Sequence, residues 1–177
     1  LGDDEVYFSR MMNCWGWGTW ADRWRNFSNN KEEIIEYFSA EKIKNFNMNG
    51  TFNFYRGLVE NFEGISETWA VFWYASIFRR DGLCLYPARS LVRNNGNDGS
   101  GNHVGLVRLN TNLCQSRIRT VSTPSKESIE GFIQLQKFYK RRRPLLYRFA
   151  LQLLMMMPAK SRLLIYKLYR RISGLKV

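Results

Sequence analysis

The spacing of apolar residues along the chain predicts a series of short helices and a few short strands. Trp69, Trp73 and Ile77 lie four residues apart, so a helix would place all three on one apolar face, and we expect Trp69 and Trp73 to be core residues. Short apolar runs that end at turn residues instead predict strands. The predicted helices cover 32–38, 40–46, 54–63, 67–80, 126–139, 145–157 and 160–172, and the predicted strands cover 6–9, 83–86, 91–92 and 106–109. This mixture indicates an α/β fold class.

Polar residues and glycines mark where several of these elements begin and end. Thr19 or Asp22 can cap a helix that follows the first tryptophans, and Ser66 can cap the helix over 67–80. Runs rich in Asn and Gly predict loops at 47–53 and 94–102.

Three tryptophans occur in one short run, Trp-Gly-Trp-Gly-Thr-Trp, at residues 15–20. Glycine lets the backbone come close to a neighbour or a ligand, and indole offers a flat apolar face with one N–H donor. The run therefore suits a surface that stacks on a polyhydroxylated ring, and it equally suits a tryptophan-rich turn in the core. Trp20, Trp24 and Phe27 recur at near-helical spacing, which favours a core position for Trp20.

Two further blocks accompany this run in the order and spacing of a known family. Tyr-Phe-Ser at 7–9 precedes the tryptophans and forms the first motif block with them, and Ser-Glu-Thr-Trp…Trp at 66–73 follows as the second block. Ser-Leu-Val-Arg-Asn-Asn-Gly at 90–96 comes next and leads to His103. In these motifs, residues 6–105 resemble the C-terminal half of bacterial family-2-like glycosyltransferases with the GT-A (nucleotide-diphospho-sugar transferase) fold.

The resemblance implies an incomplete GT-A domain that contains an acceptor platform and a catalytic base. Trp15, Gly16 and Trp17 match the tryptophan motif and are expected to bind the acceptor. Glu67 matches the carboxylate that takes the acceptor's proton, at a position where the family usually carries Asp. The alternative to a catalytic role is that Glu67 is simply an acid in the first turn of a predicted helix, where the helix macrodipole favours its negative charge.

The resemblance also implies a site for the diphosphate of the donor, formed by Arg93, Asn94 and His103. His103 is the chain's single histidine, and a neutral imidazole can ligate a divalent metal or donate to a diphosphate oxygen. A histidine in a loop is also often a plain surface residue. The family match adds Mn²⁺ or Mg²⁺ in the full-length enzyme, with a nucleotide sugar as the donor substrate.

Composition indicates a reduced chain without a zinc site. Three cysteines, an odd number, lack metal-binding spacing, and no apolar stretch reaches the roughly 18 residues of a membrane span. A nucleotide-binding half with an Asp-x-Asp motif is not found, so we expect the chain to be a fragment. The expected organisation is the C-terminal half of a GT-A domain at 1–109, a linker at 110–126 and a basic amphipathic helical tail at 127–177.

The positive charge is concentrated in the predicted tail. The formal net charge is +12, and residues 137–177 hold 12 Lys and Arg without any Asp or Glu, so the rest of the chain sums to zero. Basic amphipathic helices over 140–171 predict contact with an anionic membrane surface. Nucleic acid is a rival partner, disfavoured by the abundance of Leu, Met and aromatic residues. A helical pair packed on the first domain is a further alternative.

These features together predict a glycosyltransferase fragment. It would transfer a sugar from a nucleotide-sugar donor to a glycan or lipid-linked acceptor, in surface polysaccharide biosynthesis at the cytoplasmic face of the membrane. The alternative is a non-catalytic carbohydrate- or membrane-surface-binding module that lacks the donor half.

Overall fold

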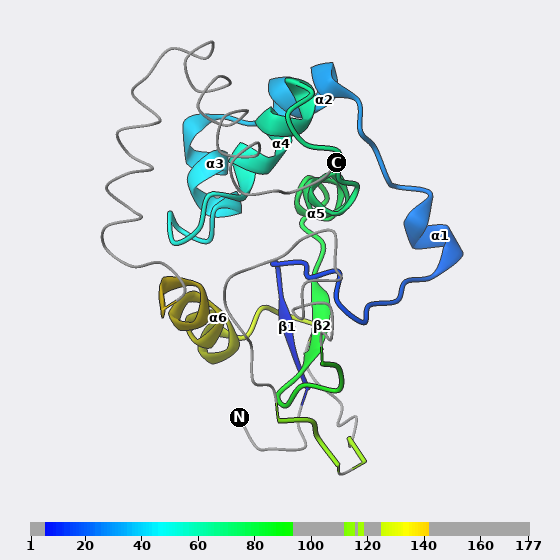
Figure 1. Ribbon diagram of the computed structural model, residues 1–177, viewed down its shortest axis with the longest axis vertical. Coiled ribbons are helices and arrows are strands. Elements are labelled where there is room, and N and C mark those ends of the chain that lie inside the picture. Colours follow the sequence, from blue (N-terminus) through cyan, green and yellow to red (C-terminus); the bar gives the residue numbers. More distant parts are fainter. Residues whose placement is uncertain (1–5, 94–111, 116, 119–124, 142–177) are drawn as a thin grey trace, which may run out of the picture. The chain divides into compact units, whose positions relative to one another are not determined.

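The computed structural model describes residues 6–93, 112–115, 117–118 and 125–141 of the chain (Figure 1). The chain divides into two compact units, Leu1–Val92 with Leu113–Lys140 and Arg93–Asn112 with Arg141–Val177, and nearly all described residues belong to the first. The described elements are β1 (Val6–Ser9), α1 (Ala21–Trp24), α2 (Lys31–Tyr37), α3 (Ala40–Phe46), α4 (Phe54–Phe62), α5 (Ala70–Phe78), β2 (Cys84–Pro87) and α6 (Ile129–Arg141). This part of the chain is therefore mixed α/β.

β1 and β2 form an antiparallel pair whose register runs from Val6 opposite Pro87 to Ser9 opposite Cys84 (Figure 1). Both strands lie within one residue of their predicted positions. A parallel bridge joins Phe8 to Glu127, and the Ser128 amide donates to the Phe8 carbonyl at 2.9 Å. β1 is thus paired on both of its edges. The predicted strand at 91–92 is wrong, since neither residue is in a strand.

Helices α2 to α5 contribute to an aromatic core. The rings of Phe46 and Tyr74 stack with centroids 4.2 Å apart, and the Tyr74 hydroxyl donates to the Phe46 carbonyl at 2.9 Å. Burial raises the pKa of Tyr74 above its ordinary value, so this hydroxyl stays a neutral donor. The buried members of this cluster are Met12, Ile34, Phe38, Phe46, Leu58, Trp73, Tyr74 and Ala75.

Three of the helices, which were predicted to within a residue or two, begin at polar caps that the sequence analysis had not singled out. The side chains of Asn30, Ser39 and Asn53 accept hydrogen bonds from backbone amides in the first turns of α2, α3 and α4. Each bond satisfies an amide that the helix itself leaves unpaired. The predicted loop at 47–53 is confirmed as turns, with Met48 and Asn49 in the left-handed region.

Two predicted helix starts are wrong. The cap position of α1 is Trp20, whose side chain makes no capping bond, so neither Thr19 nor Asp22 caps that short helix. Helix α5 begins at Ala70 instead of residue 67. Upstream of it, the Ser66 amide donates to the Glu60 carbonyl and the Thr68 amide to the Asn61 side chain. These bonds hold the chain out of a helical path until Trp69.

Helix α6 starts three residues later than predicted and packs on the first unit. Phe132 and Tyr139 are buried in a second cluster with Met11 and Met48. Gly131 allows the close approach to β1, because a Cβ built there would lie 2.3 Å from Cδ2 of Tyr7. The beginning of the segment expected as a tail therefore contributes to the core.

An ion pair reinforces this packing just before α6. The Glu127 carboxylate accepts from the Arg10 guanidinium, at 2.7 Å from Nε, and also from the Arg10 backbone amide at 2.9 Å. The hydrogen bond to Glu127 raises the pKa of Arg10. The Arg10 guanidinium also lies 4.9 Å from the ring centroid of Phe132.

The remaining predicted elements, the strand at 106–109 and the helices at 145–157 and 160–172, lie outside the described residues. Among the described helices, none combines the length and the apolar character needed to cross a bilayer.

Candidate functional site

Three half-exposed tryptophans from distant parts of the sequence meet on the surface of the first unit. The ring centroids of Trp17 lie 5.7 Å from Trp24 and 5.1 Å from Trp69, and those of Trp24 and Trp69 lie 6.1 Å apart. Their exposed fractions are 36%, 40% and 44%, whereas Trp73 beneath them is 5% exposed. We call these four residues the indole cluster. Its three outer members present aromatic surface to solvent, and Trp17 and Trp24 lie on the buried side chain of Trp73.

The segment that follows Trp24, the last residue of α1, is hydrogen-bonded to the helix that carries Trp73. Trp24 stacks on Phe27, with centroids 4.9 Å apart. The next residue, Ser28, donates its amide to the buried Ser76 hydroxyl on α5 at 2.9 Å. Since α5 also supplies Trp73, these contacts fix the indole cluster from two sides.

Gly16 sets the close approach between the tryptophan run and the segment after β2. Its φ is +62°, in the left-handed region, and a Cβ built there would lie 2.3 Å from Cγ1 of Val92. Both facts require glycine at this position. Trp15, on the preceding side, donates its amide to the Asn13 side chain at 3.0 Å. The first and third motif blocks are therefore neighbours in the fold.

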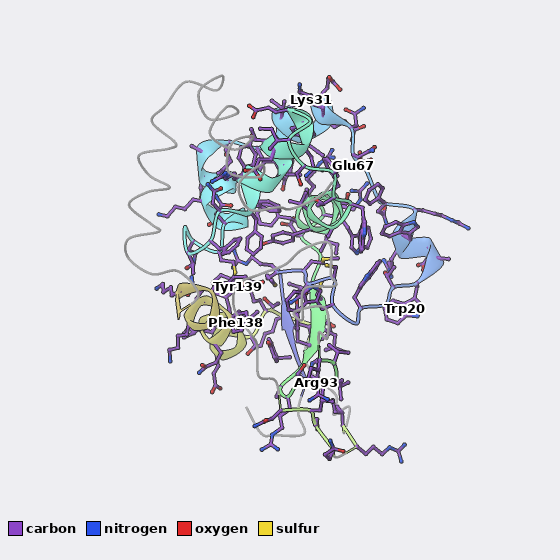
Figure 2. The ribbon with its side chains drawn as sticks, in the orientation of Figure 1. Trp20, Lys31, Glu67, Arg93, Phe138 and Tyr139 are labelled. Atoms are coloured by element: carbon purple, nitrogen blue, oxygen red, sulfur yellow. The ribbon has the colours of Figure 1, made fainter. Side chains whose placement is uncertain are left out.

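Glu67 lies in the loop that joins α4 to α5 (Figure 2), and its side chain is exposed. The loop is held at both sides of this residue. The Ser66 amide donates to the Glu60 carbonyl, and the Thr68 amide donates to Oδ1 of Asn61 at 2.8 Å. Asn61 also donates to the Gly57 carbonyl at 2.7 Å and to the Thr68 hydroxyl at 3.1 Å.

Glu67 does not occupy the first turn of α5, as the sequence had predicted. It precedes Ala70, the first helical residue, by three positions, so the helix macrodipole does not account for its place. Asn61 is instead the residue that positions the loop, and sequence reasoning missed it. The available signal was an Asn at the end of a predicted helix, seven residues before a Thr.

Two predictions about individual tryptophans are also wrong. Trp20 was expected in the core and is 76% exposed, because α1 is one turn long and buries none of its residues. Trp69 was expected in the core with Trp73 and belongs to the exposed surface, because it is the cap residue of α5 and not part of its buried face. Trp73 is buried, as predicted.

The contact between Trp17 and Trp69 brings the second motif block beside the first. Trp69 follows Glu67 by two residues, so the loop with this carboxylate ends at the indole cluster. Trp15 is about as exposed as Trp69 and lies two residues from Trp17. The structure therefore combines exposed aromatic surface with a nearby carboxylate-bearing loop.

Of the three predicted donor-side residues, the structure describes Arg93. Arg93 is exposed and belongs to the second unit (Figure 2), and Asn94 and His103 lie outside the described residues. In the portion of the chain that the structure describes, no group of three or more His, Cys, Asp or Glu side chains could hold a metal ion.

Comparisons of the chain with protein-family models, with curated proteins and with solved structures found no match.

Proposed function

We propose that this chain forms the acceptor-binding side of a glycosyltransferase with a GT-A fold, which transfers a sugar from a nucleotide sugar to a glycan or lipid-linked acceptor. The reaction is implied by the resemblance of the three motif blocks. The observation that carries the proposal is the contact between Trp17 and Trp69, because it joins the tryptophan motif to the loop with the candidate base. The donor sugar stays open.

The indole cluster is suited to hold a saccharide. A pyranose ring presents C–H groups on its faces and hydroxyls at its edge, so an aromatic face can cover the former while the latter stay hydrated. Trp17, Trp24 and Trp69 expose such surface. An aromatic contact of this kind contributes about 0.5–1.5 kcal/mol beyond the area that it buries. Trp15 and Gly16 extend the platform along the same loop.

Glu67 is the proposed general base. Attack by an acceptor hydroxyl requires a carboxylate within hydrogen-bond reach to take its proton. Glu67 is exposed, and the bonds to Ser66 and Thr68 fix the backbone on either side of it. A fixed backbone restricts where this carboxylate can reach, which is the requirement for a positioned base.

The donor side of the proposal consists of Arg93, Asn94 and His103. Their cationic and amide groups are of the kind that bind diphosphate oxygens, and His103 is also the candidate ligand for Mn²⁺ or Mg²⁺ in the full-length enzyme. Such a metal would neutralise the charge of the leaving diphosphate.

The test is transfer of labelled sugars from a panel of nucleotide sugars to glycolipid and glycan acceptors, by a protein that includes the donor-binding half. Glu67→Gln should lower the transfer rate by a factor of about 10²–10⁴, the contribution of a general base. Glu63→Gln is the matched control, since Glu63 is also an exposed acid between α4 and α5. Unchanged transfer by Glu67→Gln would remove this residue from the mechanism.

A non-catalytic carbohydrate-binding module is the second candidate. The indole cluster favours such a module as much as it favours the enzyme. All four of its residues lie in the first unit, so the cluster could bind a saccharide without a donor half. Calorimetric titration with UDP and Mn²⁺, together with the transfer assay above, separates the two. Tight binding of UDP or transfer of sugar supports a transferase, whereas saccharide binding by a protein that transfers no sugar in that assay supports the module.

A further inference from the structure

Helix α6 has one face in the core and another that is exposed, with no described residue of the first unit covering it. The inner face carries Phe132 and Tyr139, and Gln136 donates to the Met48 carbonyl at 2.9 Å and to the Thr51 hydroxyl at 3.1 Å. Figure 2 labels Tyr139 and its neighbour Phe138 on this helix; Tyr139 is buried and Phe138 is half-exposed. These contacts fix the rotation of α6 about its own axis, so its outer face has a definite composition.

The outer face presents two isoleucines followed by two lysines. Ile129 is 78% exposed and Ile133 is 41% exposed, and Lys137 and Lys140 are exposed as well. Successive members are four, four and three residues apart, which places them in one row along a helix. We call this row the outer stripe.

The sequence from the lysines of the outer stripe onward is basic. Lys126 is exposed just before α6, and Arg141, Arg142 and Arg143 directly follow Lys140 in the sequence. Glu130 is the one acid of the helix, and it already has a partner. Beyond Lys137 the chain holds no acid at all. The stripe therefore begins apolar and becomes cationic toward the basic sequence.

We propose that the outer stripe of α6 docks on the surface of an anionic bilayer. Isoleucine side chains can enter the boundary between headgroups and acyl chains, while lysines beside them contact anionic headgroups. Nucleic acid would engage the lysines and leave the isoleucines exposed to water, so the combination favours lipid. The docking is independent of the proposed transferase activity and needs neither donor nor acceptor.

Flotation of the whole chain with phosphatidylcholine vesicles, with and without phosphatidylserine, tests this docking. Wild-type protein should float with the serine-containing vesicles and be released by high salt in part. Ile129→Ser combined with Ile133→Ser should weaken binding roughly tenfold, from the loss of inserted apolar surface. Lys137→Gln should weaken it about fivefold, the effect of one lysine near an anionic leaflet.

Matched variants separate the stripe from general surface effects. Ile35→Ser with Leu85→Ser removes two half-exposed apolar side chains elsewhere, and Lys44→Gln removes an exposed lysine of α3. Both should float like the wild type, and circular dichroism should show all variants folded. The docking is overturned if wild-type protein does not float, or if the isoleucine pair can be replaced without loss. The docking is also overturned by a combination of two results. These are equal flotation of the Ile129/Ile133 and Ile35/Leu85 variants, and release of the protein from the vesicles by added nucleic acid.

Discussion

The indole of Trp69 lies 5.1 Å, centroid to centroid, from the indole of Trp17, although the two residues belong to separate motif blocks. Both rings also contact Trp24 and thereby share its support from Trp73. The contact between Trp17 and Trp69 joins the surfaces of the two motif blocks. In the fold they form one surface, with the loop of Glu67 leading directly into it.

Gly16→Ala should destabilise the tryptophan loop, because the new Cβ would meet Val92 in a left-handed backbone conformation. We expect a loss of about 1–3 kcal/mol in the free energy of unfolding, measured by urea denaturation. Gly18→Ala is the matched control, since a Cβ there meets nothing within 4 Å. Equal stabilities of the two variants would show that Val92 does not confine the loop.

Asn61→Ala should release the loop that carries Glu67. It removes the acceptor of the Thr68 amide and two donated bonds, with an expected cost of about 1–3 kcal/mol. Asn61→Asp loses the donor to the Gly57 carbonyl but retains the oxygen that accepts from the Thr68 amide, so it should keep the protection of that amide against exchange. Amide hydrogen exchange at Thr68 measures this: fast exchange in the Ala variant and slow exchange in the Asp variant are expected. Slow exchange in both would mean that Asn61 does not hold the loop.

Stability should fall in alkali partly through Cys84. Burial raises the pKa of this thiol from 9.0 to about 11, so the unfolded chain loses this proton at lower pH than the folded one. The contribution of the thiol is fully present below about pH 9 and disappears as the pH rises through about 11. Cys84→Ala should flatten the decline of urea midpoints across this window. If the Cys84→Ala variant loses stability as steeply as the wild type, the loss arises from other groups. Tyr86 is one such group, because burial also raises its pKa.

Local signals in the sequence were enough to place most of the described helices and both strands. Asn30, Ser39 and Asn53 are caps whose bonding partners lie within three residues, so they are local signals, although the caps that we predicted, at Thr19 or Asp22 and at Ser66, were wrong. β1 and β2 are short apolar runs bounded by turn residues. What the sequence could not show is that the segment at Glu127 pairs with β1, since that contact joins residues over a hundred positions apart.

The errors at the site have the same origin. The start of α5 depends on the bond between Asn61 and Thr68, which no local pattern reveals and which places Glu67 outside the helix. Trp69 shares the spacing of a buried stripe with Trp73, yet its position at the cap turns it to the surface. The exposure of Trp15 and Trp17 was one of two alternatives that the run of tryptophans and glycines allowed, and the fold selects it.

The most direct test of the central claim uses the indole N–H signals of the six tryptophans in a ¹H–¹⁵N correlation spectrum. Each signal would be assigned by a Trp→Phe variant, and the protein titrated with the best ligand from an oligosaccharide array. The account predicts that the signals of Trp17, Trp24 and Trp69 shift together with one binding curve. Saccharide binding that moves only Trp20, or leaves these three signals in place, would contradict it.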